Sequence, residues 1–310
     1  MSVLVLADHD LGALSPATAR VINAAAQLGP VDVLVVADDG AAIAQSVSTL
    51  AGVAKVLTAK GNLLADGLET LLSTLTVRYQ YLAASAGSVG KDVMPRLAAR
   101  LDVMPVTDVV EILGPNSFVR PIYAGNALQT VTDNQARHVL TIRASAFPAA
   151  ATTGHAAPIQ AIDNPVVSAA RLVASHRTES DTPDLATAQI VVGGGVALGS
   201  AENFQLIEQL AKKLGAAIGA TRAAVDAGYA PNDWQVGQTG KIIAPDLYIA
   251  IGISGALQHL AGIQGAKKIV AINTDSEAPL VKLADMALIG DLFEIIPQLL
   301  GELDKAGITR

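Results

Sequence analysis

Short segments in the C-terminal half combine glycines with hydroxyl, amide and basic side chains. The stretch 193–199 (GGGVALG) has G-x-G-x-x-x-G spacing and lies between an expected strand and an expected helix that Ser200 would cap. Glycines at such a turn let backbone N–H groups approach a diphosphate at a helix N-terminus. Because strand-to-helix turns also contain glycine for purely steric reasons, this turn by itself leaves a phosphate site and a packing role open.

A second candidate segment runs from Gly252 to His259. Ser254 is expected to cap a helix, where its hydroxyl and the neighbouring N–H groups could hold an anion. A nucleophilic serine would require G-x-S-x-G, whereas the segment reads G-I-S-G-A, so its second glycine comes one position too early. His259 follows about one helical turn after Gly255 and could share the side of the helix that meets a ligand. A buried histidine with a structural role is the alternative.

Two further polar segments complete the candidate site. Thr221 and Arg222 follow an expected strand directly, and the loop 235–241 reads QVGQTGK. The amides and the hydroxyl of that loop suit hydrogen bonding to the edge of a heteroaromatic ring better than proton abstraction. The alternatives are an exposed surface charge for Arg222 and an ordinary polar turn for the loop.

The elements that must position these residues form a strand-and-helix alternation. Strands are expected at 189–192, 216–220, 246–253, 268–272 and 286–289, with a helix at 200–214. In a parallel sheet the carboxyl ends of the strands line one crevice. The residues that follow such ends are Gly193, Thr221, Ser254, Asn273 and Asp291. Their convergence predicts a ligand site in a doubly wound, Rossmann-like domain.

Asp291 has two interpretations. It could bind a ribose, as acidic residues at strand ends do, or it could cap the helix that begins at Leu292. No pair of carboxylates and no histidine cluster in this half has the spacing of an acid/base dyad or of a metal site. The pattern therefore predicts a site that binds a reactive ligand, with no catalytic residues and no metal.

The N-terminal half also alternates, and then its pattern changes. Strands are expected at 3–6, 31–36, 56–57 and 79–84, with helices at 17–28 and up to residue 101. The segments 117–125, 127–132 and 138–143 then follow one another with short turns, which predicts antiparallel strands added to the first sheet. The polar stretch 176–184 (HRTESDTPD) is the expected linker. The predicted domains are residues 1–180 and 181–310.

Composition agrees with this α/β prediction and excludes several classes of protein. The 310 residues are 51% hydrophobic and 3% aromatic and include 27 glycines, which is typical of buried parallel strands and small-residue helices. A net charge of −7 argues against nucleic-acid binding. The absence of cysteine excludes disulfides and cysteine-ligated clusters. Because no secretory signal and no uninterrupted apolar span is recognisable, we expect a soluble, cytoplasmic protein without membrane insertion.

The chain resembles the electron-transferring flavoprotein alpha subunit. The resemblance is carried by 247–259 (LYIAIGISGALQH) with Gly262 and 270–273 (VAIN), and by the blocks 221–228 (TRAAVDAG), 235–241 and 291–293 (DLF). Similar stretches in the first domain are LADHDLG near the start, 90–92 with 95–97, and 123–127 (YAGNA). The resemblance therefore extends over essentially the whole chain.

The resemblance implies an electron carrier without substrate turnover of its own. Its expected cofactor is FAD, held mainly by the C-terminal domain, and its expected partner is a beta subunit in a heterodimer, with AMP as a candidate ligand of that subunit. The first domain would dock this partner. Single electrons would pass from donor dehydrogenases to a quinone oxidoreductase or an equivalent acceptor.

Matching positions give individual residues expected roles. Thr239 would hydrogen-bond flavin N5, His259 the C2 carbonyl, and Arg222 would lie against the isoalloxazine ring. Thr221 and Ser254 would meet the diphosphate, with Asn273 and Asp291 at the adenosine end. The predicted cofactor-binding residues are Thr221, Arg222, Gln235, Val236, Gly237, Gln238, Thr239, Ser254, Gly255, Ala256, Leu257, Gln258, His259, Asn273, Asp291 and Leu292.

One position departs from the family pattern, and three alternatives stay open. The family usually has Gly-Gly-Arg-Gly where this chain has Gly194-Gly195-Val196-Ala197, so no contact of that arginine can be assigned here.

The alternatives are an alpha-type subunit of a specialised chain, such as nitrogen fixation or flavin-based bifurcation, a nicotinamide-dependent dehydrogenase, and a non-redox nucleotide-sensing module.

Overall fold

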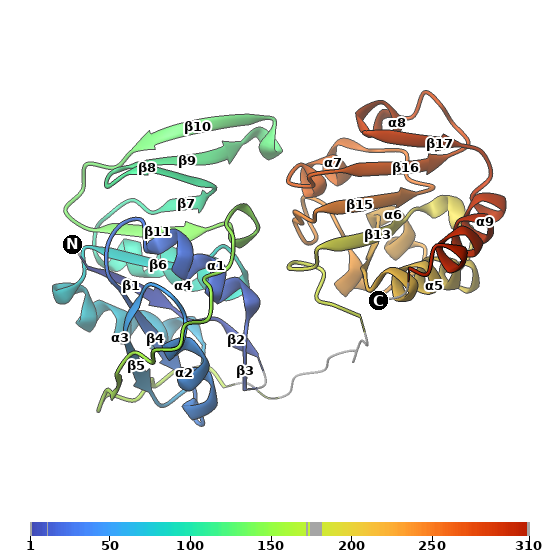
Figure 1. Ribbon diagram of the computed structural model, residues 1–310. Helices are drawn as coiled ribbons and strands as arrows, with labels where there is room; N and C mark the ends of the chain where they lie inside the picture. Colours follow the sequence, from blue (N-terminus) through green and yellow to red (C-terminus); the bar gives the residue numbers. More distant parts are fainter. Residues whose placement is uncertain (1, 11, 172, 174–181, 309–310) are drawn as a thin grey trace. The chain divides into compact units, whose positions relative to one another are not determined.

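The computed structural model describes residues 2–10, 12–171, 173 and 182–308. The chain divides into two compact units, 1–123 with 127–176, and 177–310 with the short segment 124–126 (Figure 1). The expected linker at 176–184 lies outside the described residues as far as position 181, so the boundary between 180 and 181 stays a prediction.

The first unit is built on a seven-stranded parallel sheet with the order β12-β5-β4-β1-β6-β11-β7. Its strands are β1 (Val3–Leu6), β4 (Val31–Val36), β5 (Val53–Ala59), β6 (Tyr81–Ser85), β7 (Val106–Val109), β11 (His138–Ile142) and β12 (Ile159–Ala161). The sequence predicted the central strands, whereas the short β7 and β12 were not anticipated.

Helices cover both faces of this sheet, which is why its central strands are apolar throughout. Val3 and Val5 of β1 belong to the core that includes α1 (Pro16–Ala25) and α2 (Ala41–Ser48). Leu4 and Leu6 belong to the opposite core, with α3 (Ala65–Leu75) and α4 (Ser88–Arg100). Shorter elements are β2 (His9–Asp10), β3 (Ala13–Leu14), and the 3-10 turns η1 (Thr76–Arg78), η2 (Tyr123–Gly125) and η3 (Ala144–Ala146).

The predicted antiparallel addition is present, but one of its three expected strands belongs elsewhere. A separate sheet has the order β10-β9-β8, formed by β8 (Glu111–Gly114), β9 (Ser117–Ile122) and β10 (Ala127–Thr132). The expected third strand, at 138–143, was wrongly placed: β11 runs parallel between β6 and β7. The reason is burial, since every residue of β11 is buried whereas most of β10 is exposed.

The second unit is a five-stranded parallel sheet with the order β14-β13-β15-β16-β17. Its strands are β13 (Ile190–Gly194), β14 (Ala217–Ala220), β15 (Leu247–Ile251), β16 (Ile269–Asn273) and β17 (Met286–Ile289). All five were expected near these positions. The order is that of a doubly wound sheet, in which the winding direction reverses between β13 and β15.

The second sheet is also covered on both faces. Val192, Ile249 and Ile251 pack with α5 (Gln205–Leu214) and α9 (Leu292–Lys305), whereas Tyr248 and Ala250 pack with α7 (Leu257–Ile263) and α8 (Pro279–Leu283) (Figure 1). The remaining elements are α6 (Arg222–Asp226), η4 (Val196–Leu198), η5 (Glu202–Phe204) and η6 (Asn232–Trp234). None of the helices in the described part of the chain combines the length and the hydropathy needed to cross a bilayer.

Two expected helix starts were wrong. The helix expected from residue 200 begins at Gln205, after η5, and the Ser200 hydroxyl oxygen accepts the Asn203 N–H at 3.2 Å. Helix α7 begins at Leu257 rather than next to Ser254, and its N-cap is Ala256. Gly255 has φ +90°, a left-handed conformation that a right-handed helix cannot include, so the helix must start after it.

Candidate functional site

A cavity of about 360 Å³ lies at the carboxyl ends of β13, β14 and β15, where the winding of the second sheet reverses. This is where ligands bind in open α/β sheets, and the volume is typical of a small-molecule site. Its lining residues are Gly195, Val196, Thr221, Arg222, Ala223, Asp226, Gln235, Val236, Gly237, Gln238, Thr239, Gly252, Ile253, Ser254, Gly255, Ala256, Gln258 and His259.

The structure brings most of the sequence-predicted residues together in this cavity. They are Thr221, Arg222, Gln235, Val236, Gly237, Gln238, Thr239, Ser254, Gly255, Ala256, Gln258 and His259. Four predicted residues are absent from its lining. Asn273 donates to the Ile253 carbonyl at 3.0 Å, and Asp291 accepts the Phe293 N–H at 2.8 Å as the cap of α9. Leu292 is buried, and Leu257 is 58% exposed. The roles of these four toward a cofactor stay predictions.

Some lining residues were not in the predicted set of cofactor-binding residues, although four of them belong to candidate segments of the sequence: Gly195, Val196, Gly252 and Ile253, with Ala223 and Asp226. Asp226 carries a charge into the site, and its carboxylate lies 3.3 Å from Nε of Arg222. The spacing of four residues was visible in the sequence, because residues at i and i+4 are neighbours on a helix. Both side chains are largely exposed, so this pair is weak and leaves the guanidinium available to a ligand.

Glycines shape the cavity by allowing close backbone contacts. A Cβ atom at Gly195 would overlap with the carbonyl of Gly252, and one at Gly255 would overlap with the backbone of Leu280. The first glycine of the 193–199 stretch has a different role, because a Cβ at Gly193 would overlap with the hydroxyl of Tyr248. Both glycines thus serve packing, and Gly195 also lines the cavity; the phosphate interpretation of the turn stays a prediction.

The loop 235–239 presents hydrogen-bonding groups in fixed positions. The Gln235 side-chain amide donates to Oγ1 of Thr239 at 2.9 Å, so the hydroxyl hydrogen of Thr239 remains available to an acceptor. The backbone N–H of Gln238 donates to the Gln258 carbonyl at 2.8 Å, which ties this loop to the first turn of α7. The arrangement suits recognition of a polar ring edge.

His259 is buried and engages both ring nitrogens. Nδ1 lies 3.1 Å from the Val236 carbonyl, and Nε2 lies 2.8 Å from the hydroxyl of Tyr248. Burial lowers the pKa of His259 to about 4, against the opposing hydrogen bond to Val236, and burial also raises the pKa of Tyr248. His259 is therefore neutral near pH 7. Since a carbonyl only accepts, the proton sits on Nδ1.

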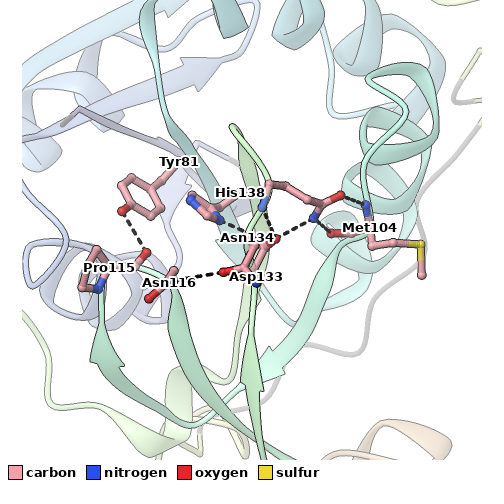
Figure 2. A network of polar contacts seen from close by, with 8 residues as sticks. Tyr81, Met104, Pro115, Asn116, Asp133, Asn134 and His138 are labelled. Atoms are coloured by element: carbon pink, nitrogen blue, oxygen red, sulfur yellow. Dashed lines mark hydrogen bonds and ion pairs between the residues drawn. The ribbon is translucent and has the colours of Figure 1, made fainter.

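A second cavity, of about 400 Å³, lies in the first unit beside a buried polar network (Figure 2). Asp133 accepts from Nδ1 of His138 at 2.7 Å and from both the backbone and the side chain of Gln135. Tyr81 stacks on His138 and donates to the Pro115 carbonyl. Burial raises the pKa of Asp133, but the bonds from His138 and Gln135 outweigh it and leave the pKa below its usual value. Through Tyr81, the network links the turn at Pro115 and the turn at Asp133 to β6.

The described residues contain no group of histidines, aspartates and glutamates that could hold a metal ion. A doubly wound sheet with a cavity at its reversal point, lined by hydrogen-bond donors, defines a cofactor-binding α/β protein.

Comparison with known proteins identifies the family. Residues 184–264 match the electron transfer flavoprotein FAD-binding domain, and residues 3–167 match the electron transfer flavoprotein domain. The chain is 50% identical to the electron transfer flavoprotein subunit alpha of Paracoccus denitrificans, over 98% of this chain and 100% of that protein. The corresponding Pseudomonas aeruginosa subunit is 45% identical over 99% and 100%, and the mitochondrial one of Arabidopsis thaliana is 46% identical over 98% and 90%.

The chain belongs to the electron transfer flavoprotein alpha subunit family. It is an FAD-binding electron carrier rather than an enzyme that turns over a substrate, which confirms the predicted cofactor and class. The alternatives of a nicotinamide-dependent dehydrogenase and of a non-redox sensor are thereby excluded.

Proposed function

We propose that the cavity of the second unit holds the flavin of FAD between the loop 235–239 and the segment 252–259. The observation that carries this proposal is the convergence of Thr239, Arg222 and Ser254, from three separate segments, on one cavity at the reversal point of the sheet. When bound, FAD accepts and releases electrons; the protein's part is to bind it, orient it and tune its potential.

The residues present fit this cofactor. Gly195 and Gly255 line the cavity without a side chain of their own. Thr239 offers a hydroxyl hydrogen that an acceptor such as N5 would take, and Arg222 offers a guanidinium that can lie flat on a ring. Thr221 and Ser254 would meet the diphosphate, and Asn273 and Asp291 the adenosine end. His259 would lie at the C2 carbonyl, although both of its nitrogens already have protein partners.

At the level of the whole protein, we propose a heterodimer with a beta subunit, with residues 1–180 as the docking domain and 181–310 as the FAD domain. Single electrons would enter from flavin-containing dehydrogenases and leave to a quinone oxidoreductase or an equivalent acceptor in the cytoplasm. The family, whose relatives are named subunit alpha, supports this assignment.

The test uses the chain purified together with its beta subunit. The complex should release FAD on heat denaturation, and a reduced flavin dehydrogenase from the same organism should bleach its flavin absorbance. A quinone oxidoreductase should then restore that absorbance. A complex without FAD, or a flavin that stays oxidised beside the reduced dehydrogenase, would contradict the proposal.

A further inference from the structure

The cavity of the first unit lies at an end of the sheet where the fold does not call for one. Tyr81, the first residue of β6, and His138, the first residue of β11, both line it (Figure 2). It therefore opens at the amino ends of these strands, whereas ligands in open α/β sheets bind at the carboxyl ends. Its volume of about 400 Å³ is enough for a small molecule. What it could bind must be read from the residues that line it.

His138 brings a ring nitrogen without a protein partner to this cavity. The residue is 3% exposed, and its Nδ1 lies 2.7 Å from Oδ2 of Asp133, which is 5% exposed. Nε2 makes no hydrogen bond within the described part of the chain. A buried polar atom without a partner costs free energy, so a ligand that bonded to Nε2 would relieve that cost.

The carboxylate of Asp133 decides which ring nitrogen holds a hydrogen. Burial raises the pKa of Asp133, but the hydrogen bonds from His138 and Gln135 outweigh burial and leave that pKa below its usual value. The group is therefore ionised near pH 7 and can only accept. Nδ1 of His138 must then be the donor, and the neutral ring has its lone pair on Nε2.

Packing holds the ring in one orientation. The Tyr81 ring stacks on the imidazole, with centroids 4.8 Å apart and an angle of 19° between the planes. Phe118 makes a tilted contact at 6.3 Å. A histidine held by a carboxylate in this way is the usual arrangement of a metal ligand, but no cluster that could complete a metal site is present among the described residues. The acceptor at Nε2 therefore suits an organic donor.

The remaining lining sets the charge of that donor. No lysine or arginine of the described chain lines the cavity, and Asp133 is its one carboxylate. The side-chain amide of Asn116 donates to Asn134 at 3.3 Å, which leaves the Asn116 side-chain oxygen to accept from a ligand. A negative charge and acceptors oppose an anion and favour a cation that carries N–H donors.

Other ionisable groups around His138 do not supply that cation. Burial raises the pKa of Tyr81, and the charge of Asp133 adds to this effect, so the phenol is uncharged. Arg137 precedes His138 in the chain, but its Nε donates to the Thr76 carbonyl at 3.1 Å. The charge of Asp133 is thus left to be balanced by a proton on His138 or by a ligand.

We propose that this cavity binds a small aliphatic ammonium compound, whose N–H groups donate to Nε2 of His138 and to the side-chain oxygen of Asn116, beside the carboxylate of Asp133. A proton on Nε2 would occupy the place of one of these bonds. Protonation of His138 and binding of the ammonium group therefore exclude each other. The site is separate from the flavin cavity, so the inference does not rest on the proposed position of FAD.

The experiment uses the full chain with its beta subunit and FAD, labelled with ¹⁵N-histidine, and n-butylammonium as the probe. The probe should move the Nε2 resonance of His138, which a His138→Asn variant assigns, with a Kd in the millimolar range or below. 1-Butanol and butyrate have similar shapes without the positive charge, and they should leave the resonance in place. Affinity should fall between about pH 8.5 and about pH 6, by up to about tenfold per pH unit.

Two variants test the residues, with saturation transfer to the methyl signal of the probe as the readout. His138→Asn keeps a donor for Asp133 but lacks Nε2, and Asp133→Asn removes the charge; each should lower the affinity at least tenfold. The matched control is Asp92→Asn, which removes the same charge from an exposed ion pair on α4 and should bind the probe like the parent. The comparison of the three probes uses only the parent and holds whether or not these variants fold.

The inference fails if n-butylammonium does not move the Nε2 resonance, or if 1-butanol moves it equally. Tighter binding of butyrate would make this an anion site and would overturn it as well. If Asp92→Asn weakened binding as much as Asp133→Asn, the probe would be attracted only by the net negative charge of the protein. A loss confined to His138→Asn and Asp133→Asn, together with the pH dependence, supports the site.

Discussion

At the residue scale, the hydroxyl of Thr239 gives the first test of the proposed site. Gln235 donates to its oxygen, so its hydrogen is free for the flavin. A donor stabilises the ring more after it has gained an electron. A lost hydrogen bond costs about 0.5 to 1.5 kcal/mol, which for a one-electron couple is some tens of millivolts. We expect Thr239→Ala to lower the first one-electron potential by that amount while FAD stays bound.

Spectroelectrochemical titration measures this shift. Thr187→Ala is the control, since Thr187 only donates to the Asp184 carbonyl and lies outside the cavity lining. Potentials that coincide for Thr239→Ala and the parent would remove Thr239 from the set of flavin contacts.

The charge of Arg222 should affect the one-electron potential of the flavin, even though its ion pair with Asp226 is weak. A unit charge about 4 Å from the ring is worth on the order of 4 kcal/mol at an effective dielectric near 20, before desolvation and solvent screening reduce it. Arg222→Ala should lower the first one-electron potential. Arg222→Lys should restore only part of it, because an ammonium cannot stack flat on a ring.

Reductive titration followed by absorbance tests this expectation, with Lys212→Ala, on α5 and outside the cavity lining, as the charge-matched control. If Arg222 were only a solvated residue at the start of α6, all three variants would titrate like the parent.

At the element scale, the turn between β15 and α7 depends on one backbone conformation. Gly255 has φ +90°, and its missing Cβ leaves room for the backbone of Leu280. Gly255→Ala should destabilise the second unit by about 1 to 3 kcal/mol through strain and should weaken FAD binding. Gly301 is the opposite case, because it lies inside α9 with open space around its Cβ position. Gly301→Ala should stabilise the second unit by about 0.5 to 1 kcal/mol.

Denaturation curves of the two variants, measured side by side, provide the comparison. Equal stability of Gly255→Ala and the parent would mean that the turn can adopt another conformation.

In the first unit, the Asp133–His138 pair should make stability depend on pH. The folded-state pKa of Asp133 is depressed, so its contribution is present above the unfolded value of about 3.9 and is lost as pH falls through the folded value. Removing one partner of a buried pair costs about 3 to 5 kcal/mol. Asp133→Ala should therefore speed amide exchange in β6 and β11, and it should flatten the acid limb of the stability curve.

Hydrogen exchange measured by peptide resolves the two units from each other. Asp92→Ala, which breaks a largely exposed ion pair with Arg96 on α4, should leave both the exchange rates and the acid limb in place. If Asp133→Ala matched that control, the network would contribute nothing to the stability of the unit.

At the scale of the whole molecule, the cofactor should depend on the partner. The relatives of this chain are named subunit alpha, and the proposed function gives the first unit the docking of a beta subunit. We expect this chain expressed alone to hold little FAD and the chain expressed with its beta subunit to form a stable yellow complex. Size-exclusion chromatography with detection at flavin and protein wavelengths decides, and a monomer carrying stoichiometric FAD would disprove the dependence.

The sequence by itself determined the central strands of the first sheet, the doubly wound second sheet and most of the cavity. Local patterns suffice for these, because buried parallel strands are continuous apolar runs and the residues after them must meet at one edge. The identity of the cofactor, FAD, came from the family motifs in the sequence. Tertiary packing decided that 138–143 lies inside the parallel sheet, because burial on two faces is a property of neighbouring elements. It also decided that Gly193 serves Tyr248 and that both nitrogens of His259 are occupied, because those contacts join residues far apart in the chain.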